Sequence, residues 1–87
     1  MNEEQLTLLG NDAEALLNTE AFTKTMNTMV DSTVQVFLGS APDEADKRTE
    51  AYGHYRALVD IVNTLRQQVE VRDQIDAKVN EEVTEEE

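Results

Sequence analysis

The chain has 87 residues, enough for one small domain, and a formal charge of −12 from 19 acidic and 7 basic residues. This balance disfavours direct binding to nucleic acid or to an anionic membrane, because both need Lys and Arg. Cysteine is absent, which excludes a disulfide framework and a thiolate metal site. We expect neither a signal peptide nor a membrane span, because MNEEQL has no basic region before an apolar run and no stretch approaches roughly 18 apolar residues.

The first segment, residues 3–17, has a helical pattern. Its apolar residues recur in steps of three and four, and the pattern is broken only at Gly10 and Asn11. The residues are Leu6, Leu9, Ala13 and Leu16. We expect a short helical segment that can fold back onto a later part of the chain.

A second helix is predicted over about residues 19–38, with Asn18 as its N-cap and Glu20 in its first turn. Met26 and Met29 suit either a core or an adaptable binding face, and their spacing with the phenylalanines favours the core. The apolar stripe consists of Phe22, Met26, Met29, Val30, Thr33, Val34 and Phe37.

The stretch FLGSAPDEADKR predicts a turn between two helices. Gly39 is expected to end the second helix in a left-handed conformation. Ser40 is expected to cap the next helix by accepting the amide of Asp43, whose carboxylate can reach back. Pro42 then falls in the first helical turn, where its missing N–H is not needed. The fold class is therefore predicted as all-α, an antiparallel helical hairpin.

The third helix is predicted over about residues 41–79 and is too long for its neighbour. At 1.5 Å per residue it extends roughly 58 Å, against roughly 30 Å for the second helix, so pairing reaches only about Asp60. Past Asp60, apolar residues continue the heptad-like pattern of the third helix, and they need another partner to cover them. These residues, the predicted protein interface, are Val62, Leu65, Val69 and Ile75.

The uncovered stripe predicts both a folded-back N-terminal segment and a second subunit as its cover, and hence a homo-oligomer. We expect one domain over residues 1–80. The remaining residues, 81–87, are acidic and almost without apolar content, which predicts a disordered tail.

No residue constellation indicates chemistry, so we expect no catalytic residue, no cofactor and no metal. The DEAD tetrapeptide at residues 43–46 has neither a preceding strand nor a phosphate-binding loop. His54, the single histidine, has no nucleophile or further metal ligand in its pattern and is expected at the surface. Gly53 marks either a close helix approach or a position without structural demand.

Three segments carry a family resemblance: LLNTEAF, VQVFLGSAPDEADKRTEAY and YRALVDIVNTLRQQ. From Asn18 to about Arg72 the pattern resembles small proteins encoded among the structural genes of tailed bacteriophages. The matching positions are Phe37, Ser40, Asp43, Arg48, Glu50, Tyr52, Ala57 and Leu58. The chain departs from the pattern at Thr19, where proline is common, at Phe37, where tryptophan is common, and at Thr49, which is an insertion.

The resemblance implies a non-enzymatic virion or assembly protein that binds a larger structural protein: a capsid, portal or scaffold protein. It also implies a location in the host cytoplasm during assembly, and in the virion for a component of the particle. The acidic surface leaves a second function open, an inhibitor that mimics DNA against a host nuclease or DNA-binding protein. The interleaving of acids with all 7 basic residues favours the assembly protein.

Overall fold

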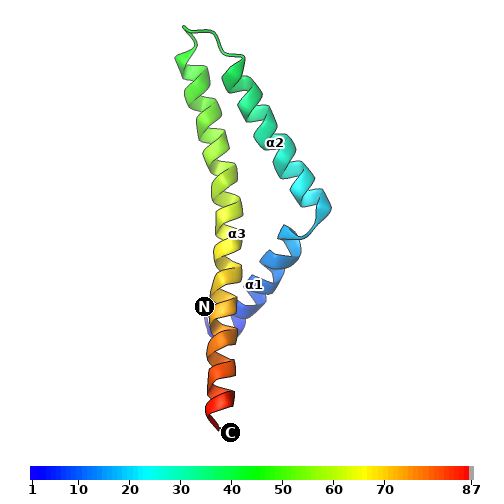
Figure 1. Cartoon of the computed structure of the whole chain (residues 1–87). Helices are drawn as coiled ribbons and strands as arrows, with labels where there is room; N and C mark the ends of the chain where they lie inside the picture. The colour runs from blue at the N-terminus through cyan, green and yellow to red at the C-terminus, as the bar shows by residue number, and fades with distance from the viewer. Residues whose placement is uncertain (87) are drawn as a thin grey trace. The chain divides into compact units, whose positions relative to one another are not determined.

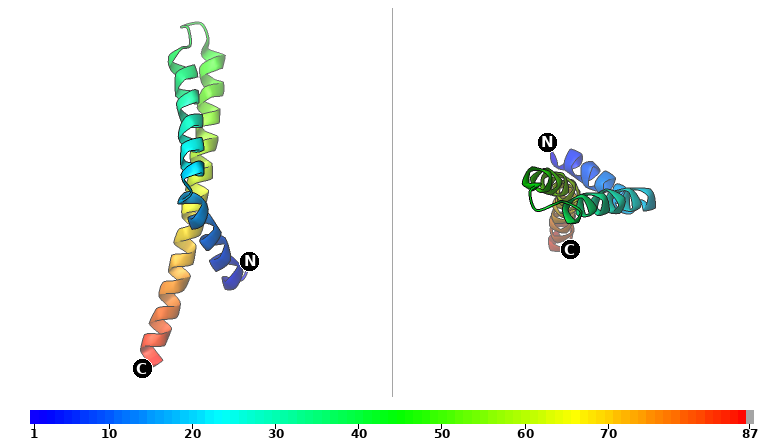
Figure 2. Two further views of the ribbon diagram at one scale, coloured as in Figure 1. Left: turned by 90° about the vertical axis from the view of Figure 1, so that its right-hand side faces the viewer. Right: turned by 90° about the horizontal axis from the view of Figure 1, so that it is seen from above.

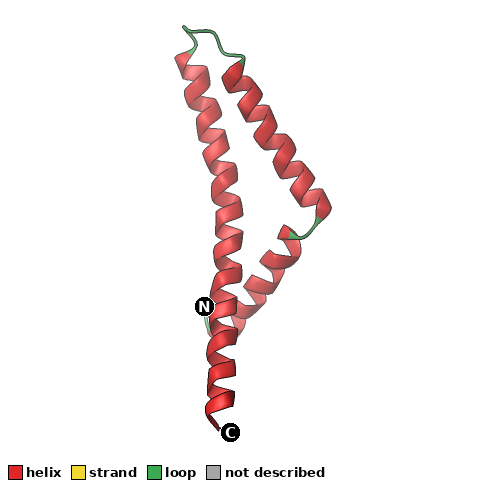
Figure 3. Ribbon diagram, in the orientation of Figure 1, coloured by secondary structure: helices red, strands yellow, loops and turns green. Residues whose placement is uncertain are grey.

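The computed structural model describes residues 1–86, and the side chains of residues 1–82. Figures 1 and 3 show three helices in it: α1 (Glu3–Leu17), α2 (Glu20–Leu38) and α3 (Ala45–Glu86). No strand lies within residues 1–86, so the all-α prediction is confirmed. No helix in this described part is both long enough and apolar enough to cross a membrane.

The chain divides into two compact units, where a single domain was expected. We call Thr19–Val62 the hairpin unit, and Met1–Asn18 with Asn63–Glu87 the terminal unit. The boundary after Val62 lies close to Asp60, where the length of α2 predicted that its pairing with α3 would end. Two units form because the second half of α3 has α1, rather than α2, as its partner.

The start of α1 is fixed by a reciprocal capping box. The Gln5 backbone N–H donates to Asn2 Oδ1 at 2.8 Å, and the Asn2 N–H donates to Gln5 Oε1 at 3.0 Å. Glu3 and Glu4 lie in the first turn, where the helix dipole favours negative charge. The helix continues through Gly10 and Asn11, the two residues that interrupt the apolar pattern.

Two predicted caps are wrong. Asn18 is the C-cap of α1, and Thr19 is the N-cap of α2, without a side-chain capping bond. Gly39 has φ −83° and is right-handed, so the predicted left-handed cap is absent. A Cβ on Gly39 would lie 3.1 Å from the Gln35 carbonyl oxygen, a tight contact that a side chain here could make only with a small shift of the backbone.

The turn after α2 is longer than predicted, because α3 begins at Ala45 rather than at about residue 41. Ser40 does not cap α3: its hydroxyl donates to the Phe37 carbonyl at 2.7 Å and so satisfies the end of α2. Pro42 lies in the turn, before the first helical turn. Glu44, rather than Asp43, reaches back, since its Oε1 accepts the Ala41 N–H at 2.7 Å.

At its other end α3 extends to Glu86, past Asn80, where a disordered tail was expected to begin. Residues 81–86 continue α3, whereas the sequence predicted a disordered tail over residues 81–87, and Glu87 lies outside the described residues. Glutamate is a good helix former, and adding residues to an existing helix avoids the cost of nucleation. Low apolar content therefore does not by itself end a helix.

The hairpin unit consists of α2 and the first half of α3, which run antiparallel from the turn (Figures 1 and 2). The two helices are closest beside the turn and diverge toward the start of α2 (Figure 1). Only Ala51 and Leu58 are buried among the side chains of the hairpin unit. Its core is thin, because the large apolar residues of α2 are at most half-buried.

Candidate functional site

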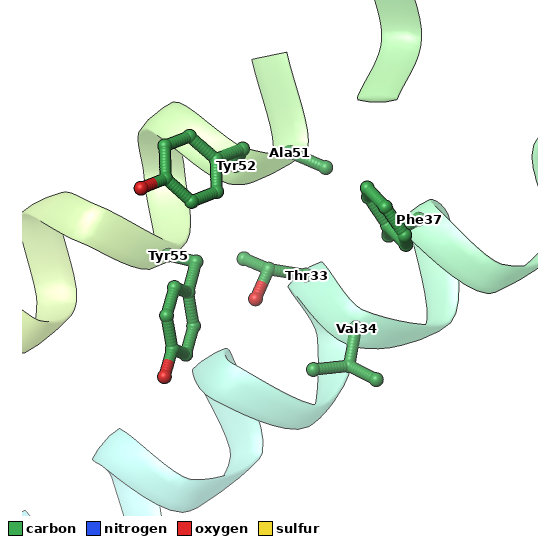
Figure 4. Close-up of a pocket in the computed structure, with 6 residues that line it drawn as sticks. All are labelled: Thr33, Val34, Phe37, Ala51, Tyr52 and Tyr55. Carbon is green, nitrogen blue, oxygen red and sulfur yellow. The ribbon is translucent and has the colours of Figure 1, made fainter. Parts of the chain in front are cut away.

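A groove lined by aromatic side chains lies along one side of the hairpin unit. Small side chains at its base, Thr33 from α2 and Ala51 from α3, let the two helices approach. Figure 4 shows the Tyr52 and Tyr55 rings on one side of the opening and the Phe37 ring on the other. We call this surface the aromatic groove; its residues are Thr33, Val34, Phe37, Ala51, Tyr52 and Tyr55.

The aromatic groove encloses about 210 Å³. Typical pockets for drug-sized ligands are about 300–1,000 Å³ and contain a few convergent polar groups. All six lining residues are apolar or uncharged. The aromatic groove therefore suits a protein side chain better than a metabolite.

Two further hollows of the hairpin unit both include His54, and we call the surface that they form the histidine groove. The lining of one hollow includes the charged residues Lys47 and Glu50. The lining of the other is uncharged apart from His54 and includes Met29, Ala57 and Ile61. His54 is exposed, as the sequence predicted. No group of three or more His, Cys, Asp or Glu within the described residues has the geometry to hold a metal ion.

The turn of the hairpin unit is held by Arg48, a role that sequence reasoning missed. Its guanidinium donates to the Ala41 carbonyl at 2.7 Å, the Ser40 hydroxyl at 3.1 Å and the Pro42 carbonyl at 3.2 Å. Arg48 also lies four residues after Glu44, a spacing that by itself favours only an ordinary ion pair within the helix. An arginine one turn into a helix and directly after a proline-containing turn was the available signal.

Glu44 supplies the opposite charge at the turn. Its carboxylate accepts the Ala41 N–H and lies 3.5 Å from Lys47 Nζ. The hydrogen bond from Ala41, followed by the charge of Lys47, lowers the pKa of Glu44 below its usual value of 4.5. Gly39, Ser40 and Pro42, the predicted turn residues, all lie in this segment, between α2 and α3.

In the terminal unit, α1 lies close to α3 at Gly10. A Cβ on Gly10 would lie 2.8 Å from the Gln68 carbonyl oxygen and would also collide with the Cβ of Arg72. Gly53 has no such neighbour, since a Cβ there would meet nothing within 4 Å. The close helix approach that the sequence allowed at Gly53 is therefore found at Gly10, in another helix.

Arg72 joins α1 to α3 beside this crossing. Its guanidinium donates to Asn11 Oδ1 at 3.0 Å, to Glu14 Oε2, and to Asp73 Oδ1 at 2.8 Å, with 12% of its side chain exposed. The hydrogen bond to Glu14, followed by the bond to Asp73, raises the pKa of Arg72 above its usual value. A more exposed ion pair of 3.6 Å joins Lys78 to Glu3.

The four predicted interface residues are half-buried. Leu65, Val69 and Ile75 belong to the terminal unit, together with α1, whereas Val62 ends the hairpin unit. Their role in binding a partner stays a prediction. Of the twelve large apolar residues exposed in the described part of the chain, four lie in the terminal unit, namely Met1, Leu8, Leu16 and Val79. The other eight lie in the hairpin unit: Met29, Val34, Val36, Phe37, Leu38, Tyr52, Tyr55 and Ile61.

The methionines divide between the two roles considered for them. Met26 is half-buried, whereas Met29 is exposed in the histidine groove. Phe37, expected in the core, is exposed in the aromatic groove.

Charge is distributed unevenly between the units. The terminal unit holds twelve of the 19 acids and three of the 7 bases, a net charge of −9, and the hairpin unit holds seven acids and four bases, a net charge of −3. The hairpin unit, which has the smaller net charge, is therefore also the unit with the exposed aromatic side chains.

Comparison of the chain with protein-family models, with curated proteins and with solved structures gives no match. The function is accordingly argued from the surfaces described above and from the sequence motifs.

Proposed function

We propose that this chain is a non-enzymatic structural or assembly protein that binds itself and a larger structural protein through its helical surfaces. The observation that carries the proposal is the exposed apolar and aromatic surface of the hairpin unit. Contiguous exposed apolar patches on small proteins mark interaction surfaces, because their burial against a partner is favourable.

The setting of this proposal is the particle of a tailed bacteriophage. The support is the resemblance carried by LLNTEAF, by the turn segment and by YRALVDIVNTLRQQ. The larger partner is then a capsid, portal or scaffold protein, met in the host cytoplasm during assembly. The chain needs neither a cofactor nor a metal for this role.

Co-expression with the structural proteins encoded by neighbouring genes tests the proposal. The tagged chain is expected to co-elute with one of them on size exclusion, with a fixed stoichiometry. Leu8→Asp is a suitable control, because Leu8 is exposed and lies in α1, outside the hairpin unit. Co-elution with no capsid, portal or scaffold protein would contradict the assembly role.

A second candidate function, an acidic mimic of DNA, is favoured by the charge of the terminal unit. Its net charge of −9 includes three bases, of which Arg72 and Lys78 already pair with acids. A mimic occupies the phosphate-binding groove of a nuclease or DNA-binding protein. It should compete with DNA, and the competition should weaken as salt rises. Salt-resistant binding to a structural protein would favour the assembly role.

A further inference from the structure

The contact between α1 and α3 in the terminal unit depends on where its few bases lie. α1 contains four acidic residues and no basic one, and residues 63–87 contain eight acids and three bases. Arg72 of α3 donates to Glu14 of α1. Lys78 lies 3.6 Å from Glu3. A helix that is as acidic as α1 can dock here only with its acids opposite these two bases, because its other acids are repelled.

Shape adds a second requirement at the same contact. A Cβ on Gly10 would collide with the Gln68 carbonyl oxygen and with Arg72. Gly10 and Ala13 are the two buried residues of α1. Asn11 Oδ1 accepts a hydrogen bond from Arg72 at 3.0 Å. The cover of this part of α3 therefore needs a small residue beside Gln68 and an acceptor beside Arg72, and α1 has both.

A single backbone torsion separates α1 from α2. Asn18 is right-handed, with φ −88° and ψ −3°, whereas Thr19 has φ −76° and ψ 123°. A helical ψ at Thr19 would make α1 and α2 one continuous helix, in which the first amides of α2 bond to the last carbonyls of α1. Neither residue is proline or glycine, the two that most disfavour a helix interior. The connection is therefore a short hinge that can redirect α1.

We infer that two copies of this chain exchange α1, so that α1 of each copy docks on residues 63–82 of the other. The exchanged contact is the one that α1 makes within a single chain, so its charges and shape are already complementary. Exchange of an identical element is a low-cost route to a dimer, and a short hinge favours it. This inference rests on the self-binding part of the proposed function and names its surface, and it leaves the exposed residues of the hairpin unit to the larger partner.

Charge reversal in the full chain tests the exchange. Arg72→Glu places two acids opposite each other, and Glu14→Arg places two bases opposite each other. When the two variants are mixed, only exchange restores both contacts, because native Glu14 then meets native Arg72 and the two introduced charges are opposite. After joint unfolding in urea and refolding, mixed dimers should form at least about nine-tenths of all dimers, against roughly half for random pairing. Native mass spectrometry separates the species by mass.

Two controls accompany the mixture. The chain that carries both substitutions has a complementary pair again, and it should recover the helix content and the dimer fraction of the native chain. A mixture of Glu4→Arg and Arg66→Glu chains has the same net charges as the test mixture. Both residues are exposed and neither takes part in the contacts described above, so these chains should pair at random.

The hinge gives a second measurement. A flexible Gly/Ser insertion between Asn18 and Thr19 should lower the dimer fraction in sedimentation equilibrium, because a longer connection favours docking of α1 on its own chain. The same insertion before Met1 leaves the hinge unchanged and should have no effect.

The possible results separate this inference from the proposed function. A native chain that is monomeric throughout the micromolar range would overturn both the exchange and self-binding. A native dimer whose charge variants pair at random would overturn only the exchange and leave self-binding to another surface. A dimer fraction unchanged by the insertion at the hinge would likewise overturn the exchange alone.

Discussion

The two units close the space between their helices by different means. In the terminal unit a glycine lets α1 contact the backbone of α3, and Arg72 joins the two helices through hydrogen bonds. In the hairpin unit the helices diverge from the turn (Figure 1). Phe37, Tyr52 and Tyr55 line a groove between them. A close approach joins the helices of the terminal unit, whereas the hairpin unit leaves the larger share of the exposed apolar residues, which a partner can cover.

The difference shows that a long helix can support two kinds of surface. The second half of α3 has its cover within the same chain, supplied by α1. The first half faces a shorter helix that leaves grooves on both sides. Residues with similar heptad-like spacing along α3 therefore serve internal packing in one unit and exposed surface in the other.

The largest effect is expected from removing the main buried side chain of the hairpin unit. Leu58 is 6% exposed, and Leu58→Ala should lower the free energy of unfolding by about 2–3 kcal/mol. The lower part of the usual range applies because a thin core can relax into the cavity. Urea unfolding followed by circular dichroism, at one fixed chain concentration, measures the change.

The matched control is Leu8→Ala in α1, where the side chain is 57% exposed. It should change the unfolding free energy by less than about 0.5 kcal/mol. Equal losses for both variants would show that the hairpin unit has no core of its own and would remove the contrast between the units.

The two mid-helix glycines should respond to alanine with opposite signs. Gly10→Ala places a Cβ 2.8 Å from the Gln68 carbonyl oxygen and should destabilise the chain by about 1–2 kcal/mol, despite the better helix propensity of alanine. Gly53→Ala meets no atom within 4 Å and should stabilise it by up to about 1 kcal/mol. Thermal melts of the two variants beside the native chain test the pair, and stabilisation by both would contradict the close approach at Gly10.

Helical periodicity was sufficient to predict the helices and the end of the hairpin pairing. The apolar steps from Phe22 to Phe37 and along α3 indicated two helices joined by a turn, and their lengths placed the end of pairing near Asp60. The structure places the unit boundary after Val62. Period and length are properties of one helix, so they can be read from the sequence.

Properties that depend on two helices could not be predicted in this way. Gly10 and Gly53 both lie inside helical patterns. Which of the two positions requires a glycine depends on the helix faces that pack together. The role of Arg48 depends on the path of the turn, which brings three acceptors to one guanidinium. Phe37 lies beside the turn and is exposed, which depends on the face that α2 turns toward α3 and not on the spacing of its apolar residues alone.

Arg48 gives a third test, of whether the hairpin unit is fixed at its turn. Arg48→Met removes hydrogen bonds to the Ser40 hydroxyl and two carbonyls and should cost about 1 kcal/mol, a value reduced for partial exposure. Arg56→Met, in the same helix, removes an exposed pair with Asp60 and should cost less than about 0.5 kcal/mol. Urea midpoints of the two variants make the comparison, and a larger loss for Arg56→Met would show that the turn does not depend on Arg48.

The smallest effect on stability is expected from the charge of Glu44, which acts within the turn of the hairpin unit. Arg72 of the terminal unit, in contrast, joins two helices. The pKa of Glu44 is lowered in the folded chain, first by the Ala41 N–H and then by Lys47. The stabilisation is therefore fully present above the unfolded pKa of about 4.5 and is lost as the pH falls through the lower folded value.

Below about pH 5, the Glu44→Gln variant should lose less stability than the native chain as the pH falls. Its neutral amide oxygen still accepts the Ala41 N–H but does not titrate. Lys47→Met should reduce this acid-dependent loss without abolishing it, since the hydrogen bond from Ala41 is the larger cause. Urea midpoints of the three chains from pH 3 to pH 7 decide the point: identical acid profiles for the native chain and Glu44→Gln would mean that the carboxylate does not stabilise the turn.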